Sequence, residues 1–320
     1  MNLLKVGVIG TGVMGENHVR VYSNLTNQCQ LIGVYDQNID RAHKIAEKYN
    51  TKSYKKLEDL LQKVDAVTIA VPTSFHYDVA LLCIRHKVHM LIEKPITDNT
   101  KEGELLLSKA HKAGVIIQVG HIELFNPTIQ VLKKILKNED VIAIDIHRLS
   151  PMSNRILKEN VVQDLMIHDL YILYELLDDE IQDFQAFGKT YEGFIRHAMM
   201  IAKFKKGVIS QVTASFKTED KVRTIRITTE KAFIQADLIS RTILISRSTN
   251  YYLNHIGTNY KQQNVIERVM VPPKEPLNSQ LSHFIKTIKK NATPKVTGED
   301  GLKFLKITEQ ISNKIFEHDQ

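Results

Sequence analysis

The sequence lacks the features that mark secreted, membrane or fibrous proteins. It has no tryptophan and only two cysteines, Cys29 and Cys83, in 320 residues. Two cysteines so far apart cannot build a disulfide framework, which indicates a reducing compartment. No stretch approaches the roughly 18 consecutive apolar residues of a membrane span, and a secretory signal does not fit before Lys5. We therefore expect a soluble, cytoplasmic protein that does not enter a membrane.

Glycine and proline are also scarce, with 14 and 8 residues, and no linker rich in Gly, Ser or Pro interrupts the chain. The net charge of +7 comes partly from lysine pairs such as Lys133-Lys134, which lack interleaved aromatic residues, so we expect no nucleic-acid partner. With 43% hydrophobic and 25% charged residues the composition is globular, and the length indicates two closely joined domains.

The first 120 residues alternate short apolar runs with segments of helical periodicity. Such βαβ alternation predicts a doubly wound parallel sheet, so residues 1–120 are expected to form a Rossmann domain. The predicted strands are Leu3–Ile9, Gln30–Tyr35, Ala66–Val71, Val88–Ile92 and Val115–Val119, and the predicted helices include Asp40–Tyr49, Leu57–Gln62, Tyr77–His86 and Lys101–Ala113, the last ending at Gly114.

After Gly120 the pattern changes to consecutive strands joined by turn signals. Residues 121–320 are expected to form an α+β domain, built on a large, mainly antiparallel sheet, that binds substrate and associates into a homodimer or homotetramer. A helix over Asn160–Leu177 interrupts the strands, and two more, Leu277–Lys290 and Gly301–Phe316, close the chain and can pack back on the first domain. The predicted strands are Val141–Arg148, Phe184–Phe187, His197–Phe204, Val208–Phe216, Arg223–Thr228, Ala232–Asp237 and Thr242–Ile245.

A Gly-x-Gly-x-x-Gly turn follows the first predicted strand and opens a helix. Gly10 permits the tight turn, Gly12 allows backbone to approach a pyrophosphate, and Gly15 allows the helix to pack on the strand. We expect the whole turn to line a dinucleotide: Gly10, Thr11, Gly12, Val13, Met14 and Gly15.

The second predicted strand is followed by Asp36, at the distance from Gly15 where a carboxylate accepts both ribose hydroxyls of an adenosine. Since a carboxylate repels a 2′-phosphate, NAD is favoured over NADP. NADP remains an alternative because the guanidinium of Arg41 could turn to a 2′-phosphate. The other interpretation of Arg41 is a solvated charge on the helix surface.

Several further strings occur in order along the chain: Val71-Pro72-Thr73 with His76, Glu93-Lys94-Pro95, Gly120-His121 and Asp164-x-x-x-His168. With the glycine turn, they give the sequence a resemblance to the Gfo/Idh/MocA family of NAD(P)-dependent sugar, inositol and sugar-nucleotide dehydrogenases. The likeness covers nearly the whole chain. It implies a cis peptide before Pro95 and cofactor contacts from Val71, Thr73, His76 and Lys94. Glu93 can face the cofactor or pair with Lys94. Thr73 or Ser74 could instead cap the following helix.

Oxidation of a carbinol requires a base for the hydroxyl proton and a cation or donor for the developing alkoxide. Lys94 suits the second task because it follows a strand of the parallel sheet, at the edge where such folds bind ligands. Asp164 and His168 are four residues apart and share one helix face. The resemblance assigns Asp164 to orienting substrate hydroxyls and His168 to acid–base chemistry. The structural alternatives are an exposed lysine and an Asp–His pair on a helix surface.

A metal site is the other interpretation of Asp164 and His168, with His121 as a third ligand. No cysteine cluster or third carboxylate supports it, so we expect no metal. The other histidines considered are expected to have no role: His18, His43, His86, His89, His111 and His147.

The string from Gly120 to Pro127 looks like one found in the family branch that includes UDP-N-acetylglucosamine 3-dehydrogenases, with Leu124 in place of the usual arginine. His121 and Asn126 are therefore candidates for substrate contact; the alternative is a boundary loop in which Pro127 starts a helix.

The expected function is NAD-dependent oxidation of a secondary hydroxyl of a sugar or sugar nucleotide, with the 3-hydroxyl of a UDP-N-acetylhexosamine as best candidate. The alternatives are an NAD-dependent glycoside hydrolase, an inositol or polyol dehydrogenase, and a non-catalytic NAD-binding regulator. Specificity is expected to reside in the loops Leu149–Leu157 and Tyr251–Asn264.

Overall fold

The chain divides into two compact units in the computed structural model, which describes residues 3–153, 156–248 and 264–318. The first unit runs to Phe125 and also includes Lys274–Lys306, and the second holds Asn126–Pro273 and the chain from Ile307. This division differs from the single cut expected near Gly120. The reason is the late segment, whose apolar side chains belong to the core of the first unit.

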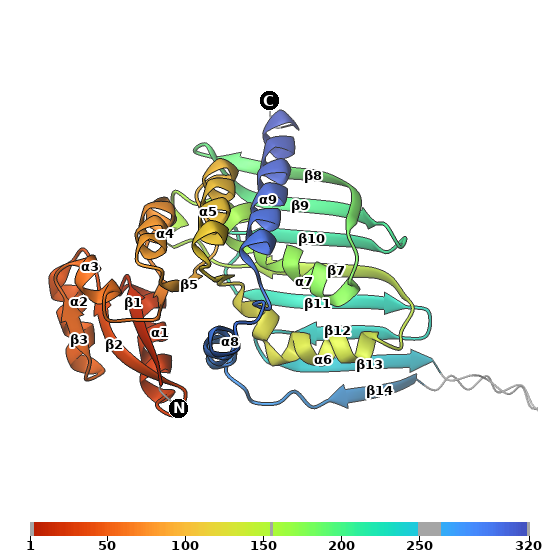
Figure 1. The fold of residues 1–320 in the computed structure, drawn as a ribbon. Coiled ribbons are helices and arrows are strands. Elements are labelled where there is room, and N and C mark those ends of the chain that lie inside the picture. Colours follow the sequence, from red (N-terminus) through yellow and green to blue (C-terminus); the bar gives the residue numbers. More distant parts are fainter. Residues whose placement is uncertain (1–2, 154–155, 249–263, 319–320) are drawn as a thin grey trace, which may run out of the picture. The chain divides into compact units, whose positions relative to one another are not determined.

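The first unit is built on a parallel sheet with strand order β3-β2-β1-β4-β5-β6 (Figure 1). This is the order of a doubly wound dinucleotide-binding fold, which confirms the predicted Rossmann architecture. The strands are β1 Leu4–Ile9, β2 Cys29–Tyr35, β3 Lys52–Tyr54, β4 Ala66–Ile69, β5 His89–Ile92 and β6 Ile117–Val119. The helices are α1 Val13–Asn24, α2 Ile39–Lys48, α3 Leu57–Leu61, η1 Thr73–Phe75, α4 His76–Arg85, α5 Thr100–Ala113, η2 Ile122–Phe125 and α8 Pro276–Lys290.

Burial on both faces explains why the strands of this sheet are continuously apolar. Val6 and Val8 of β1 point to one face of the sheet and Ile9 to the other, and all three are fully buried. Helix α8 joins the core on the α1 side through Leu281 and Phe284, which are also fully buried. The C-terminal helix pattern thus packs back on the nucleotide-binding fold.

The second unit is built on an eight-stranded sheet with order β14-β13-β12-β11-β7-β10-β9-β8 (Figure 1). Its neighbours pair antiparallel except β7 and β10, which are parallel, so the expected mainly antiparallel sheet is confirmed. The strands are β7 Val141–Leu149, β8 Ile181–Tyr191, β9 Phe194–Phe204, β10 Ile209–Ser215, β11 Val222–Thr229, β12 Phe233–Asp237, β13 Thr242–Ser248 and β14 Asn264–Val269.

Helices cover one face of this sheet. In β7 the side chains of Ile144, Ile146 and Arg148 are buried, whereas Asp145 and His147, which point to the opposite face, stay partly exposed. The helical elements are α6 Pro127–Leu136, a π-helical turn η4 Val162–Met166 and α7 Ile167–Leu177; α9 Gly298–His318 has residues in both units. No helix within the described ranges is long and apolar enough to cross a membrane.

Candidate active site

The glycine turn between β1 and α1 has room for a ligand at one glycine and none at the other two. A Cβ on Gly15 would lie 1.8 Å from the carbonyl oxygen of Gly10, and Gly10 itself has a φ of +87°. A Cβ on Gly12 would meet nothing within 4 Å. Gly12 is also the N-cap of α1 and provides no side-chain cap, while Val13 and Met14 are exposed beside it. An uncapped helix N-terminus of this kind suits the pyrophosphate of a dinucleotide.

Asp36, directly after β2, faces this turn. Its carboxylate accepts hydrogen bonds from the backbone N–H of Thr11 at 2.7 Å, the Thr11 hydroxyl at 2.9 Å and the Asn38 N–H at 2.8 Å. Arg41 of α2 adds a bidentate pair at 2.8 and 3.1 Å. Burial alone would raise the pKa of Asp36, but these hydrogen bonds outweigh it and hold the pKa below its usual value.

Glu93, Lys94 and Pro95 form the turn after β5, and the bond between Lys94 and Pro95 is cis, as the resemblance implies. The Glu93 carboxylate lies 3.0 Å from Nε2 of His18, a fully buried residue of α1. A Cβ on Gly120 would lie only 2.9 Å from the Glu93 carboxylate, so this glycine makes room for it.

The ring of His76 is buried, and both of its nitrogens face backbone carbonyl oxygens and not a space for a ligand. Nδ1 lies 2.8 Å from the carbonyl oxygen of Pro95, and Nε2 lies 3.0 Å from that of Val71. Burial lowers the pKa of the ring despite these two acceptors. His76 therefore ties the ends of two neighbouring strands together. Neither Thr73 nor Ser74 caps α4 with its side chain; the N-cap is Phe75.

His121 and Asn126, the candidates for substrate contact, are both buried. The His121 ring packs edge-on against Phe304 at a centroid distance of 5.6 Å. Burial, and secondarily the charge of Lys94, lower the pKa of His121 to about 3, so the ring is neutral. Asn126 caps α6 by accepting from the N–H of Thr128 at 3.0 Å, and Pro127 is the first residue of that helix.

The second unit carries Asp164 and His168 on consecutive turns of the helical segment. Asp164 lies in η4 and His168 in α7, and both are partly exposed. Nδ1 of His168 forms a short hydrogen bond with the hydroxyl of Tyr171, whose ring is buried. The predicted helix therefore exists, but it begins with a π-helical turn. This π-helical turn contains Asp164 and ends two residues before His168. Such turns are frequent at functional sites.

Arg196 of β9 fixes the approach to this helix and was not anticipated from the sequence. It is buried, and its guanidinium donates to the carbonyl oxygens of Ile156, Leu157 and Glu159 at 3.1, 2.5 and 3.0 Å. Of the two loops expected to select the substrate, residues 154–155 and 251–263 lie outside the described residues.

The predicted residues thus form two groups, one in each unit. The first unit brings the glycine turn to Asp36 and holds Lys94 in a turn fixed by His18 and His76, and the second places Asp164 beside His168 on one helical segment. No group of three or more His, Cys, Asp or Glu residues suited to a metal occurs in the part of the chain that the structure describes.

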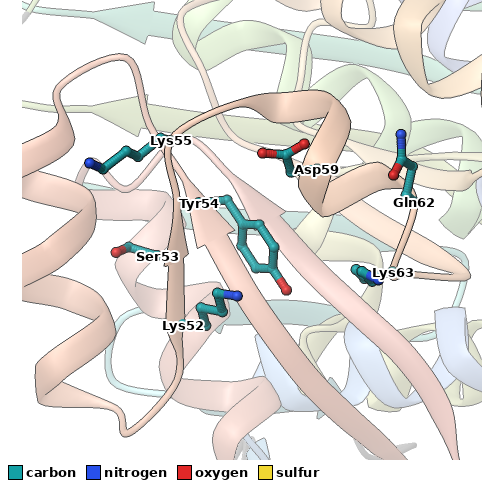
Figure 2. A pocket seen from close by; sticks show the side chains of 7 residues that line it. All are labelled: Lys52, Ser53, Tyr54, Lys55, Asp59, Gln62 and Lys63. Atoms are coloured by element: carbon teal, nitrogen blue, oxygen red, sulfur yellow. The ribbon is translucent and has the colours of Figure 1, made fainter.

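A pocket at β3 and α3 has none of the predicted site residues in its lining (Figure 2). The Lys52 ammonium lies 4.9 Å from the centre of the Tyr54 ring. Since β3 is an edge strand, lysines there discourage pairing with another chain, which accounts for them without a ligand. The lining residues are Lys52, Ser53, Tyr54, Lys55, Asp59, Gln62 and Lys63.

Known proteins match both units. The model of an oxidoreductase family with an NAD-binding Rossmann fold, GFO/IDH/MocA, matches residues 4–121, and the GFO/IDH/MocA C-terminal domain matches residues 145–235. A UDP-N-acetylglucosamine 3-dehydrogenase from Acidithiobacillus ferrooxidans is 32% identical over 76% of each chain. A myo-inositol 2-dehydrogenase from Thermotoga maritima is 23% identical over 93% of this chain and 92% of its own. The solved structure of the Acidithiobacillus enzyme superposes with a TM-score of 0.90 over 100% of both chains.

Proposed function

The chain belongs to the GFO/IDH/MocA family of oxidoreductases, and from this premise we propose that it oxidises the 3-hydroxyl of a UDP-N-acetylhexosamine with NAD as hydride acceptor. The observation that carries the substrate is the 32% identity to a UDP-N-acetylglucosamine 3-dehydrogenase.

The first unit would hold the cofactor. The N-terminus of α1, whose N-cap Gly12 offers no side chain, fits the pyrophosphate, and the Asp36 carboxylate fits the adenosine ribose. Val71, two residues after β4, and Thr73 of η1 would complete the site together with the turn that contains Glu93 and Lys94. NAD would be preferred over NADP because the buried Asp36 carboxylate would accept a hydrogen bond from a 2′-hydroxyl and would repel a 2′-phosphate.

In this proposal, the chemical step is assigned to Lys94 in the first unit and to Asp164 and His168 in the second. Bound nicotinamide supplies the hydride acceptor. With Nδ1–H of His168 donating to the Tyr171 oxygen, the other ring nitrogen accepts the substrate hydroxyl proton. The Lys94 ammonium stabilises the alkoxide that develops as this proton leaves, and Asp164 accepts a hydrogen bond from a neighbouring hydroxyl.

Two or more copies would associate through the sheet of the second unit. Phe187, Met199, Ile201 and Ile209 are exposed, and the strand register places them on one face of β8, β9 and β10. Exposed apolar residues that are contiguous on a sheet are typical of a contact between copies. Light scattering of the pure protein tests this association.

The function is tested by incubating the protein with NAD or NADP and a panel of UDP-sugars, free sugars and inositols, and recording the absorbance of reduced nicotinamide. We expect oxidation of a UDP-N-acetylhexosamine with NAD. We also expect Lys94→Ala to abolish turnover while NAD affinity stays within about threefold. Equal loss of both would contradict the role of Lys94.

The other outcomes identify the other functions. Turnover of inositol alone indicates a polyol dehydrogenase, and release of an aglycone without net nicotinamide reduction indicates a glycoside hydrolase. Tight NAD binding without any turnover indicates a regulator.

A further inference from the structure

The turn that carries Lys94 is held on both sides by buried histidines from different helices. His18 of α1 is fully buried, and its Nε2 lies 3.0 Å from Oε1 of Glu93. His76 of α4 lies on the other side, 2.8 Å from the carbonyl oxygen of Pro95. The residue between these two anchor points is Lys94. Sequence reasoning gave His18 no role, yet it contacts the residue next to the expected catalytic lysine.

Glu93 depends on His18 for its position. Its side chain is only 13% exposed and lies against the backbone of Gly120. A carboxylate with so little exposed surface needs hydrogen-bond donors, and among the described residues the other donor is the backbone N–H of Lys94, at 3.4 Å. The His18 ring is therefore the close donor that fixes which way the carboxylate points.

The His18 ring in turn is committed to this one contact. Nδ1 is buried and has no hydrogen-bond partner within the described parts of the chain. The tautomer with its proton on Nε2 satisfies Glu93 and leaves no buried N–H unpaired on the other side of the ring. Since the ring has no accessible surface, its effect on a ligand must pass through Glu93.

We propose that His18 is a positioning residue for Lys94. By donating to Glu93 it fixes the turn after β5 and so sets the direction in which the Lys94 side chain leaves that turn. Loss of this contact misplaces the ammonium without removing it. This inference rests on the proposed function only in assigning Lys94 to the chemical step.

Two amide substitutions at His18 distinguish the effect of its hydrogen bond to Glu93 from the effect of removing a buried ring. In His18→Gln the amide nitrogen has nearly the reach of Nε2, whereas in His18→Asn the shorter side chain does not reach Glu93. The matched control is Tyr22→Phe. Tyr22 lies one turn further along α1 and is 1% exposed. Its hydroxyl hydrogen-bonds to the Thr68 hydroxyl at 3.0 Å and not to a residue of the Lys94 turn.

We expect His18→Gln to keep kcat within about threefold of the natural protein and His18→Asn to lower kcat about tenfold or more, with the Kd for NAD changed less than about threefold. Tyr22→Phe is expected to lower the melting temperature without changing kcat. The proposal is overturned if His18→Asn keeps its kcat, if it loses no more than Tyr22→Phe does, or if NAD affinity falls as much as kcat.

A second measurement needs no substrate. Competitive acetylation of the cofactor-free protein, read by mass spectrometry, gives the reactivity of Lys94 relative to Lys101, an exposed lysine of α5. We expect the relative reactivity of Lys94 to change more than about threefold in His18→Asn, and to stay constant in His18→Gln and Tyr22→Phe. Unchanged reactivity in His18→Asn overturns the proposal. Absence of turnover by the natural protein with every sugar instead contradicts the proposed function and leaves this measurement decisive for His18.

Discussion

The guanidinium of Arg41 donates two hydrogen bonds, of 2.8 and 3.1 Å, to the carboxylate of Asp36, where the ribose of NAD is proposed to bind. The side chain of Asp36 is 4% exposed, whereas that of Arg41 is 52% exposed and can move into solvent. Thr11 and Asn38 also hold the carboxylate, so the acid stays in place. Ribose hydroxyls would therefore replace Arg41, and the released guanidinium would be available to a 2′-phosphate.

Removing the guanidinium should therefore change the choice of cofactor. We expect Arg41→Met to tighten NAD binding by up to about fivefold, because a partly exposed ion pair that competes with the ligand is worth about 0–1 kcal/mol. NADP binding should weaken about tenfold or more, since a phosphate loses its cation. Titration calorimetry with both cofactors measures this. Lys44→Met, which removes an exposed charge from the same helix, is the control, and weaker NAD binding in Arg41→Met but not in Lys44→Met would show that Arg41 contacts NAD itself.

Adding one methyl group to Gly12 or to Gly15 should separate the effect of the glycine turn on NAD binding from its effect on folding. Gly12→Ala should fold normally, because its Cβ meets no atom within 4 Å and its φ of −68° suits alanine. Its NAD affinity should fall about tenfold or more, because the methyl group occupies the space for the pyrophosphate. Gly15→Ala should instead fail to fold or melt far lower, since its Cβ would lie 1.8 Å from a carbonyl oxygen. Circular dichroism and NAD titration distinguish the two, and unaltered NAD binding by Gly12→Ala would contradict the assigned site.

Local patterns predicted the elements whose signals are local. The buried strand β1, the glycine turn after it and the end of α5 at Gly114, where φ is +68°, all follow from neighbouring residues. Strand β3 was missed because Lys52–Tyr54 is short and largely polar, and β14 was also missed.

Features that depend on contacts between distant segments could not be read from the sequence. The return of α8 to the first unit depends on packing against α1 across most of the chain. The same holds for the site. The candidate residues came from motifs, whereas the roles of His18 and Arg196 depend on partners 75 and about 40 residues away. A buried histidine and a buried arginine look in sequence like any other polar residue beside an apolar run.

His121 should make the protein sensitive to acid. Burial, with the nearby charge of Lys94, lowers the pKa of its ring from 6.5 to about 3. Between these values the unfolded chain binds a proton that the folded chain does not, so the free energy of unfolding falls as the pH falls below the unfolded pKa. The expected contribution is about 1.4 kcal/mol per pH unit between about pH 6 and pH 4, and none above about pH 7.

His121→Leu removes this titration. Its free energy of unfolding, from urea denaturation followed by circular dichroism, should fall less steeply with acid than that of the natural protein. His43→Gln, which removes an exposed histidine of α2, is the control. Parallel curves for the natural protein and His121→Leu would contradict the pKa assigned to His121.

The pair of Arg148 and Asp169 should be strongly coupled in stability. Nε of Arg148 lies 2.9 and 3.0 Å from the two carboxylate oxygens of Asp169, and the two side chains are 2% and 0% exposed. Removing one partner leaves the other charge buried, so Arg148→Met and Asp169→Leu should each lower the free energy of unfolding by about 3–5 kcal/mol. The double variant should lose less than either single variant, because no unpaired charge remains. Urea denaturation of the four proteins measures the coupling. It is followed by circular dichroism because the chain has no tryptophan. Additive losses would mean that each side chain is held mainly by other partners.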